Sequence, residues 1–93
     1  MTLSLDDLRQ QVHEIDTELV NLLRKRMTVV LRIGQTKSKQ GFPMQDNKRE
    51  QEVISHVLTL DHDPIPSDDL NALFQHIIRI CLEAQKKAYK NND

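Results

Sequence analysis

The feature that most constrains this 93-residue chain is an apolar seam too long for a small globular domain to cover. Apolar side chains recur at alternating steps of three and four, with one gap, at Leu5, Leu8, Val12, Ile15, Leu19, Leu22, Val29 and Ile33. This period is that of an α-helix with a heptad-like stripe. A helix from about residue 5 to about residue 39 would be ~50 Å long. Its stripe therefore needs a second long helix beside it.

Glycine and proline predict where this helix ends and where two others lie. The expected breaks are Gly41-Phe42-Pro43 and Asp63-Pro64-Ile65-Pro66. A short second helix should begin near Asp46 or Asn47, and a third should follow Ser67 as its N-cap. Their expected buried stripes are Val53, Ile54, Val57 and Leu58, then Leu70, Leu73, Phe74, Ile77, Ile78, Cys81 and Leu82. No segment alternates like a strand, so residues 1–93 are expected to form one all-α domain of three helices.

Composition excludes several classes of partner. Thirteen Lys and Arg against fourteen Asp and Glu leave a net charge of −1, so no global field attracts nucleic acid or an anionic membrane. With no Trp, one Tyr and two Phe, stacking platforms for single strands are also missing. No apolar run approaches the ~18 residues that a membrane span needs. A single cysteine and no signal-peptide pattern favour the cytoplasm, and the small size favours an oligomer.

Polar side chains occupy positions on the apolar stripes. Continuing the seam four residues past Leu22 reaches Arg26, and Lys37 projects within about 20° of Arg26, three turns further on. Gln85 lies on the inward stripe of the third helix. Taken singly, Arg26 can pair with a carboxylate, Lys37 can extend to solvent and Gln85 can bond a neighbouring helix. Together the three favour a ligand site.

Arg9 adds a geometric constraint. It precedes Arg26 by ~25 Å and Lys37 by ~42 Å along one helix, so no small molecule could touch all three in one chain. If two long helices pack antiparallel about a two-fold axis, Arg9 of one protomer approaches the other protomer's Arg26 and Lys37. A solvated Arg9 near the helix start remains the alternative at this point.

The ordered set of these residues resembles the all-helical chorismate mutase family (type II), over about residues 5–88. The resemblance rests on Leu8-Arg9, Ile15-Asp16, Leu22-Leu23, Arg26, Ile33-Gly34, Lys37, Asp46, Arg49-Glu50 and Gln85. It implies an isomerase that rearranges chorismate to prephenate in phenylalanine and tyrosine biosynthesis. It also implies an intertwined homodimer whose two active sites contain residues of both chains. The pericyclic reaction would need neither metal nor cofactor.

The resemblance assigns roles to most of the candidate residues. Arg26 and Arg49 would bind substrate carboxylates from one chain, and Arg9 would reach in from the other. Guanidinium groups suit this task because they bind carboxylates in a bidentate fork. Lys37 and Gln85 would flank the ether oxygen of the breaking bond and stabilise the negative charge that develops there.

Three further positions complete the expected site. Glu50, with the backbone at Asp46, would hold the ring hydroxyl. Cys81 departs from the family pattern, in which a small hydroxyl residue commonly lies one turn before the glutamine. A thiol is a weaker hydrogen-bond donor, so Cys81 is either a modified substrate contact or a small packing residue. The four histidines show no metal-ligand spacing.

Two other functions remain open. The first is isochorismate-pyruvate lyase, a pericyclic elimination on the same fold, although the Asp46-x-x-Arg49-Glu50 pattern resembles the mutase version. The second is a non-catalytic helical dimer that serves as an interaction or regulatory module, since a fold alone does not imply a function.

Overall fold

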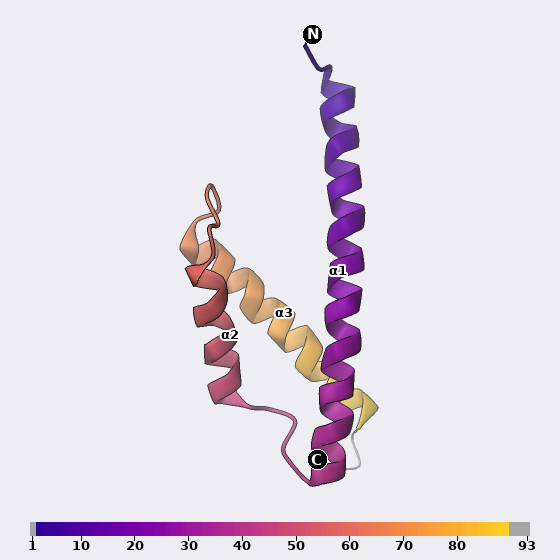
Figure 1. The fold of residues 1–93 in the computed structure, drawn as a ribbon, viewed down its shortest axis with the longest axis vertical. Helices are drawn as coiled ribbons and strands as arrows, with labels where there is room; N and C mark the ends of the chain where they lie inside the picture. The colour runs from indigo at the N-terminus through magenta and orange to yellow at the C-terminus, as the bar shows by residue number, and fades with distance from the viewer. Residues whose placement is uncertain (1, 90–93) are drawn as a thin grey trace.

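Three helices make up the fold of residues 2–89, which are the residues that the computed structural model describes. They are α1 (Leu5–Gln40), α2 (Asn47–Thr59) and α3 (Ser67–Ala88), and no strand occurs within residues 2–89. Figure 1 shows α2 and α3 beside the C-terminal half of α1, while the N-terminal half of α1 extends away from them. Helix α3 packs against both other helices. The expected all-α class and helix lengths are confirmed.

Both ends of α1 are set by local hydrogen bonds. At the start, Ser4 Oγ accepts from the Asp7 backbone N–H and the Ser4 N–H donates to Asp7 Oδ2, each at 3.1 Å. These bonds form a capping box. Hydrogen bonding from the Ser4 backbone, and secondly its side chain, lowers the pKa of Asp7. At the other end Gly41 takes a left-handed conformation (φ 75°) that favours glycine, and its N–H bonds the carbonyls of Lys37 and Ser38.

The starts of the two shorter helices differ in how well the sequence predicts them. Asp46 is the N-cap of α2, because its Oδ1 accepts from the Arg49 N–H at 3.1 Å. The prediction that Ser67 is the N-cap of α3 is wrong by one position. Pro66 is the N-cap, with no side-chain hydrogen bond, and Ser67 is already the first helical residue. Proline's fixed φ suits this extended entry (φ −62°, ψ 144°).

The core of the chain is small and lies where α2, α3 and the loop before α2 meet. Its buried apolar residues are Met44, Ile54, Val57, Leu70 and Cys81. Leu73, expected on the buried stripe of α3, is instead 53% exposed, so no other part of residues 2–89 covers it fully. No helix among the described residues combines the length and the apolar character needed to cross a membrane.

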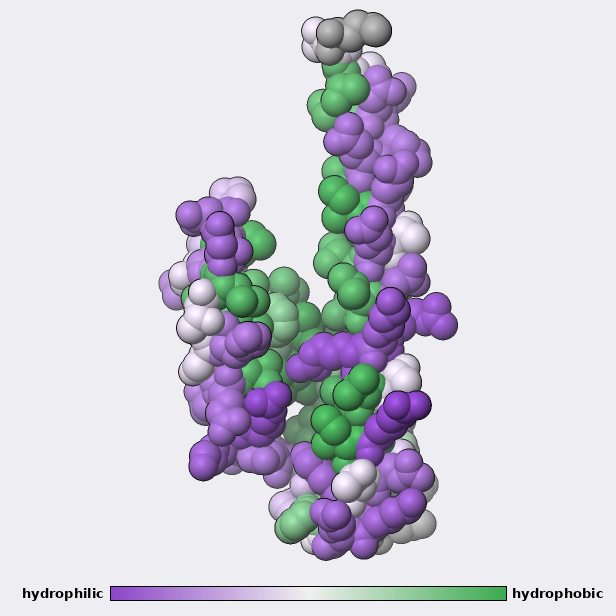
Figure 2. Space-filling view, viewed as in Figure 1, coloured by the Kyte–Doolittle hydropathy of each residue, from purple (hydrophilic) through white to green (hydrophobic). Residues whose placement is uncertain are grey.

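The apolar seam of α1 is uncovered. Its members are between 45% and 61% exposed: Leu5, Leu8, Val12, Ile15, Leu19, Leu22, Val29 and Ile33. Figure 2 shows this stripe on the edge of α1 that faces the hollow between α1 and the α2–α3 pair. An apolar surface of this length is unusual on a lone soluble domain and marks an interaction surface.

Candidate active site

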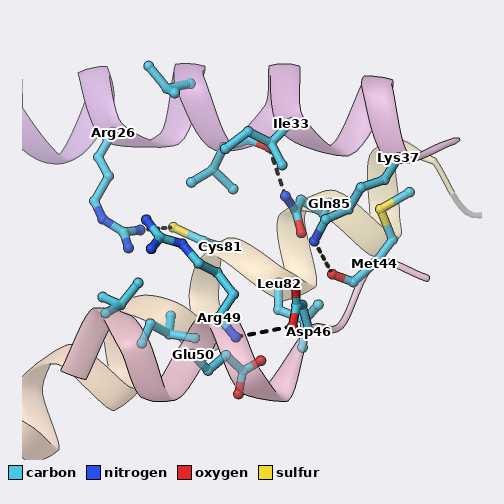
Figure 3. Close-up of a pocket in the computed structure, with 14 residues that line it drawn as sticks. Arg26, Ile33, Lys37, Met44, Asp46, Arg49, Glu50, Cys81, Leu82 and Gln85 are labelled. Carbon is cyan, nitrogen blue, oxygen red and sulfur yellow. Dashed lines mark hydrogen bonds between the residues drawn. The ribbon is translucent and has the colours of Figure 1, made fainter. Parts of the chain in front are cut away.

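A cavity of about 250 Å³ lies between the C-terminal half of α1, the start of α2 and the C-terminal half of α3 (Figure 3). It is lined by every predicted site residue except Arg9, namely Arg26, Lys37, Asp46, Arg49, Glu50, Cys81 and Gln85. Apolar side chains, among them Val30, Ile33 and Leu82, form the rest of its wall. The structure therefore brings together residues spread over sixty positions of the sequence.

Helix α1 supplies two cations three turns apart. Arg26 is half-buried, and its Nη1 donates to Cys81 Sγ at 3.2 Å. Lys37 is also half-buried, and its Nζ donates to the backbone carbonyl of Met44 at 2.8 Å. Both side chains point into the cavity (Figure 3). The angular argument that placed Arg26 and Lys37 on one strip of the helix is confirmed.

Helix α3 supplies a buried amide. Gln85 is 6% exposed, and its Nε2 donates to the backbone carbonyl of Val30 at 2.8 Å. A carbonyl can only accept, so the nitrogen of this amide, and not its oxygen, must face α1. Because an amide nitrogen carries two hydrogens, Gln85 keeps a second donor besides the one that Val30 uses.

Helix α2 contributes three charged side chains from its first turn. Asp46 uses Oδ1 to cap the helix. Arg49 points toward Arg26 from the opposite wall (Figure 3) and also bonds Glu52 Oε2 at 3.4 Å. Glu50 is half-buried. The cavity thus has two guanidinium groups at one end and an ammonium with an amide at the other.

This distribution of charge suits an anionic ligand with an oxygen remote from its carboxylates. Forked guanidinium groups bind carboxylates, and a cation next to an amide donor can stabilise negative charge on a nearby oxygen. Within residues 2–89, no cluster of three or more His, Cys, Asp or Glu could hold a metal ion.

Arg9 lies outside this cavity, on the exposed N-terminal half of α1. Its side chain is 67% exposed and approaches Asp6 as an ionic partner, with Nη1 and Oδ1 4.0 Å apart. Because Arg9 is far from Arg26 and Lys37 along α1, its side chain cannot reach the cavity of its own chain. Its role in a second protomer's site stays a prediction.

Two contributors to the site went unnoticed in the sequence. Met44 holds Lys37 through its backbone carbonyl, and Tyr89 Oη donates to the Leu31 carbonyl at 3.0 Å, one turn beyond Gln85. Backbone carbonyls carry no residue-type signature, so Met44 gave no signal. Tyr89 had a weak one, because it continues the inward stripe of α3 four residues past Gln85.

Comparison with known proteins places most of the helical region in one family. The model of the family "Chorismate mutase type II" matches residues 8–86. A bifunctional chorismate mutase/prephenate dehydratase of Aquifex aeolicus is 33% identical over 87 residues, covering 89% of this chain and 24% of that protein. Its counterpart in Buchnera aphidicola (subsp. Acyrthosiphon pisum) is 31% identical over 88 residues, covering 94% and 23%. This chain thus spans about a quarter of the length of these relatives.

Solved structures of similar length share the fold. A chorismate mutase from Thermus thermophilus (Form II) superposes with a TM-score of 0.85 at 28% identity, covering 88% of this chain and 93% of that one. A chorismate mutase from Helicobacter pylori, solved in complex with prephenate, gives a TM-score of 0.84 at 30% identity, covering 92% and 93%.

Proposed function

The chain belongs to the chorismate mutase type II family, and from this premise we propose that it is an isomerase that rearranges chorismate to prephenate. The observation that carries the proposal is the cavity itself, in which Arg26 and Arg49 converge at one end while Lys37 and Gln85 lie at the other. The relative from Helicobacter pylori, solved with prephenate, supports the same chemistry. The reaction serves phenylalanine and tyrosine biosynthesis.

Positioning is the first part of the mechanism. In the rearrangement the C–O bond of the ether breaks and a C–C bond forms within the same molecule, so no group is transferred to or from the protein. The extended substrate must be folded into a compact, chair-like geometry. Arg26 and Arg49 bind its carboxylates as forked, charge-assisted partners and hold the two reacting ends together, which lowers the entropic part of the barrier.

Charge stabilisation is the second part. Negative charge grows on the ether oxygen as its bond to carbon stretches. Lys37 Nζ, held by the Met44 carbonyl, and the second N–H of Gln85 Nε2 are the donors that we assign to this oxygen. Because both donors are fixed before the reaction, they stabilise the transition state more than the ground state.

The ring hydroxyl of the substrate is assigned to the start of α2. Glu50 is half-buried in the cavity wall, and its carboxylate has no hydrogen-bond or ion-pair partner among residues 2–89. We place the hydroxyl between this carboxylate and the backbone at Asp46. Cys81 lies beside Arg26 and therefore borders the carboxylate end.

A second copy of the chain is the proposed partner for the uncovered seam of α1. Two α1 helices packed antiparallel about a two-fold axis would bury the exposed seams against each other and against the partner's α3. The exposed face of α3 that contains Leu73 and Ile80 adds apolar surface for this contact. In such an intertwined homodimer Arg9 of each protomer would enter the other's cavity and contribute to substrate binding.

The remaining expectations follow from this assignment. The matched residues extend over all three helices, which supports reading residues 1–93 as one chorismate mutase domain. Residue 1 and residues 90–93 of this expected domain lie outside the described residues. No cofactor is required by the proposed chemistry, and the cytoplasm is the proposed location.

The test is the disappearance of chorismate absorbance with the purified chain in buffer that contains a chelator, followed by identification of the product. Prephenate formation would support the proposal, and retained activity with chelator would support metal independence. If chorismate were not consumed but pyruvate were released from isochorismate, the chain would be a lyase. No reaction with either substrate would leave a non-catalytic helical dimer as the function.

A further inference from the structure

Gly34 creates a gap in the surface of α1, and the end of α3 fills this gap. The glycine is buried in the interior of α1 and its φ is not positive, so backbone conformation does not require it. A Cβ built at this position would lie 3.0 Å from Tyr89 Cε2 and 3.1 Å from both Tyr89 Cδ2 and Gln85 Cγ. Glycine is also less favourable than alanine in the interior of an α-helix. This close approach of α3 is the physical reason for the glycine.

Two adjacent carbonyls of α1 are exposed by the gap and accept side-chain donors from α3. Gln85 Nε2 donates to the Val30 carbonyl at 2.8 Å, and Tyr89 Oη donates to the Leu31 carbonyl at 3.0 Å. Within a helix each carbonyl already accepts one backbone N–H, and its second lone pair is available for such a bond. Gln85 and Tyr89 are four residues apart, so both donors project from one face of α3.

Tyr89 does not line the cavity, so its part in the site is indirect. Its ring and Gln85 Cγ lie against the same point above Gly34, which limits the space in which the Gln85 side chain can rotate. Tyr89 is also the C-cap of α3, where its N–H bonds the Gln85 carbonyl at 3.0 Å. Backbone and side chain of Tyr89 therefore both constrain the turn that carries Gln85.

We propose that Tyr89 is a positioning residue for Gln85: it holds the last turn of α3 on α1, so that Gln85 Nε2 keeps its bond to Val30 and presents its second N–H to the cavity. This inference rests on the proposed function for its effect on turnover. Without Tyr89, the gap over Gly34 would be open, and Gln85 could leave its position. The amide would then spend part of its time turned away from the reacting oxygen.

The experiment compares Tyr89→Phe, which removes only the hydroxyl, and Tyr89→Ala, which also removes the ring, with Lys87→Ala as the control. Lys87 is exposed in the same last turn of α3 and does not line the cavity. We expect Tyr89→Ala to lower kcat by roughly tenfold or more and Tyr89→Phe by a smaller factor, with KM for chorismate nearly unchanged, because losing a preorganised donor affects the transition state. Lys87→Ala should match the parent chain.

A double-variant cycle separates positioning from a general loss of stability. If Tyr89 acts through Gln85, Tyr89→Phe or Tyr89→Ala should cost little further kcat once Gln85→Ala is present. The proposal would be overturned if the losses in kcat from the Tyr89 and Gln85 substitutions multiplied in the double variant. It would also be overturned if the Tyr89 variants raised KM alone. Where Tyr89→Ala does not fold, Tyr89→Phe alone completes the cycle.

A second readout does not depend on catalysis. The side-chain amide signals of Gln85 in ¹H–¹⁵N spectra, assigned by their loss in Gln85→Ala, should shift and exchange faster with solvent in Tyr89→Phe than in Lys87→Ala. Unchanged Gln85 signals would refute the positioning role. If the parent chain did not consume chorismate but the signals moved as expected, the proposed function would fail while the positioning of Gln85 by Tyr89 would stand.

Discussion

The Lys37 side chain crosses the turn at the end of α1 and donates from Nζ to the backbone carbonyl of Met44, 2.8 Å away. Met44 is buried, and the turn between the two residues is fixed by Gly41 in its left-handed conformation. The ammonium group is therefore held at the cavity wall by a carbonyl that cannot easily move. Preorganisation of this kind is what makes a charge effective in a transition state.

Replacing Lys37 with alanine should lower kcat by ~10²–10³-fold, the usual effect of removing one preorganised donor of this type. Helicity and the oligomeric state should not change, because neither depends on the ammonium group. The measurement is initial rates of chorismate consumption together with circular dichroism. Lys39→Ala, an exposed position in the last turn of the same helix, is the matched control. Near-normal turnover in Lys37→Ala would show that the catalytic assignment is wrong.

Mixing two inactive variants should restore activity if the site is shared between chains. In a heterodimer of Arg9→Ala and Arg26→Ala, one site carries both lesions and the other carries neither. Equal mixtures should reach about a quarter of the parent activity, since about half of the dimers are mixed and each has one intact site. The measurement is turnover after the two variants have been unfolded and refolded together. Without any gain over the separate variants, Arg9 would not act across the dimer.

A charge placed on the exposed seam of α1 should separate the dimer. Ile15→Glu would bury a carboxylate without a partner in the seam, which is strongly unfavourable. Thr17→Glu is the control, because Thr17 lies on the opposite face of the helix at nearly the same level. Sedimentation should detect a shift toward monomer for Ile15→Glu only. Equal effects of both substitutions would argue against the seam as the dimer interface.

The start of α1 should loosen in acid as the Asp7 carboxylate is protonated. The pKa of Asp7 is lowered in the folded chain, first by the Ser4 backbone N–H. The ionised carboxylate of Asp7 therefore stabilises the folded state at pH values above the ordinary pKa of aspartate. This stabilisation is lost as the pH falls through the lowered pKa of Asp7 in the folded chain. Carbon-detected NMR titration should find the pKa of Asp7 below the ordinary value of an aspartate side chain. In Ser4→Ala the pKa of Asp7 should rise toward that ordinary value, and an unchanged pKa would contradict the capping role.

Features that depend on local periodicity could be predicted from the sequence. The seam from Leu5 to Ile33 determines α1, and 100° per residue suffices to place Arg26 and Lys37 on one strip. The Asp46 cap is equally local. The positions of these helices, together with the family resemblance, suffice to predict most of the polar residues that line the cavity.

What could not be predicted depends on how the helices approach each other. Met44 acts through a backbone carbonyl, which no spacing rule reveals. Spacing places Tyr89 on the inward stripe of α3, but it does not reveal which group of α1 its hydroxyl contacts. Leu73 has the right spacing for a buried residue, yet within residues 2–89 it is 53% exposed. The shift from Ser67 to Pro66 at the start of α3 is a one-residue boundary difference of the kind that sequence patterns do not resolve.

The bond between Arg26 Nη1 and Cys81 Sγ, at 3.2 Å, bears on how readily the cavity accepts an anion. A thiol sulfur is a weak acceptor, whereas a carboxylate oxygen forms a charge-assisted bond with a guanidinium group. An arriving carboxylate therefore exchanges a weak partner for a strong one. With serine at this position, the departing partner would be a better acceptor and the exchange less favourable. The sulfur of Cys81 therefore holds the Arg26 side chain in an extended conformation, and breaking this weak bond costs little free energy when an anion binds.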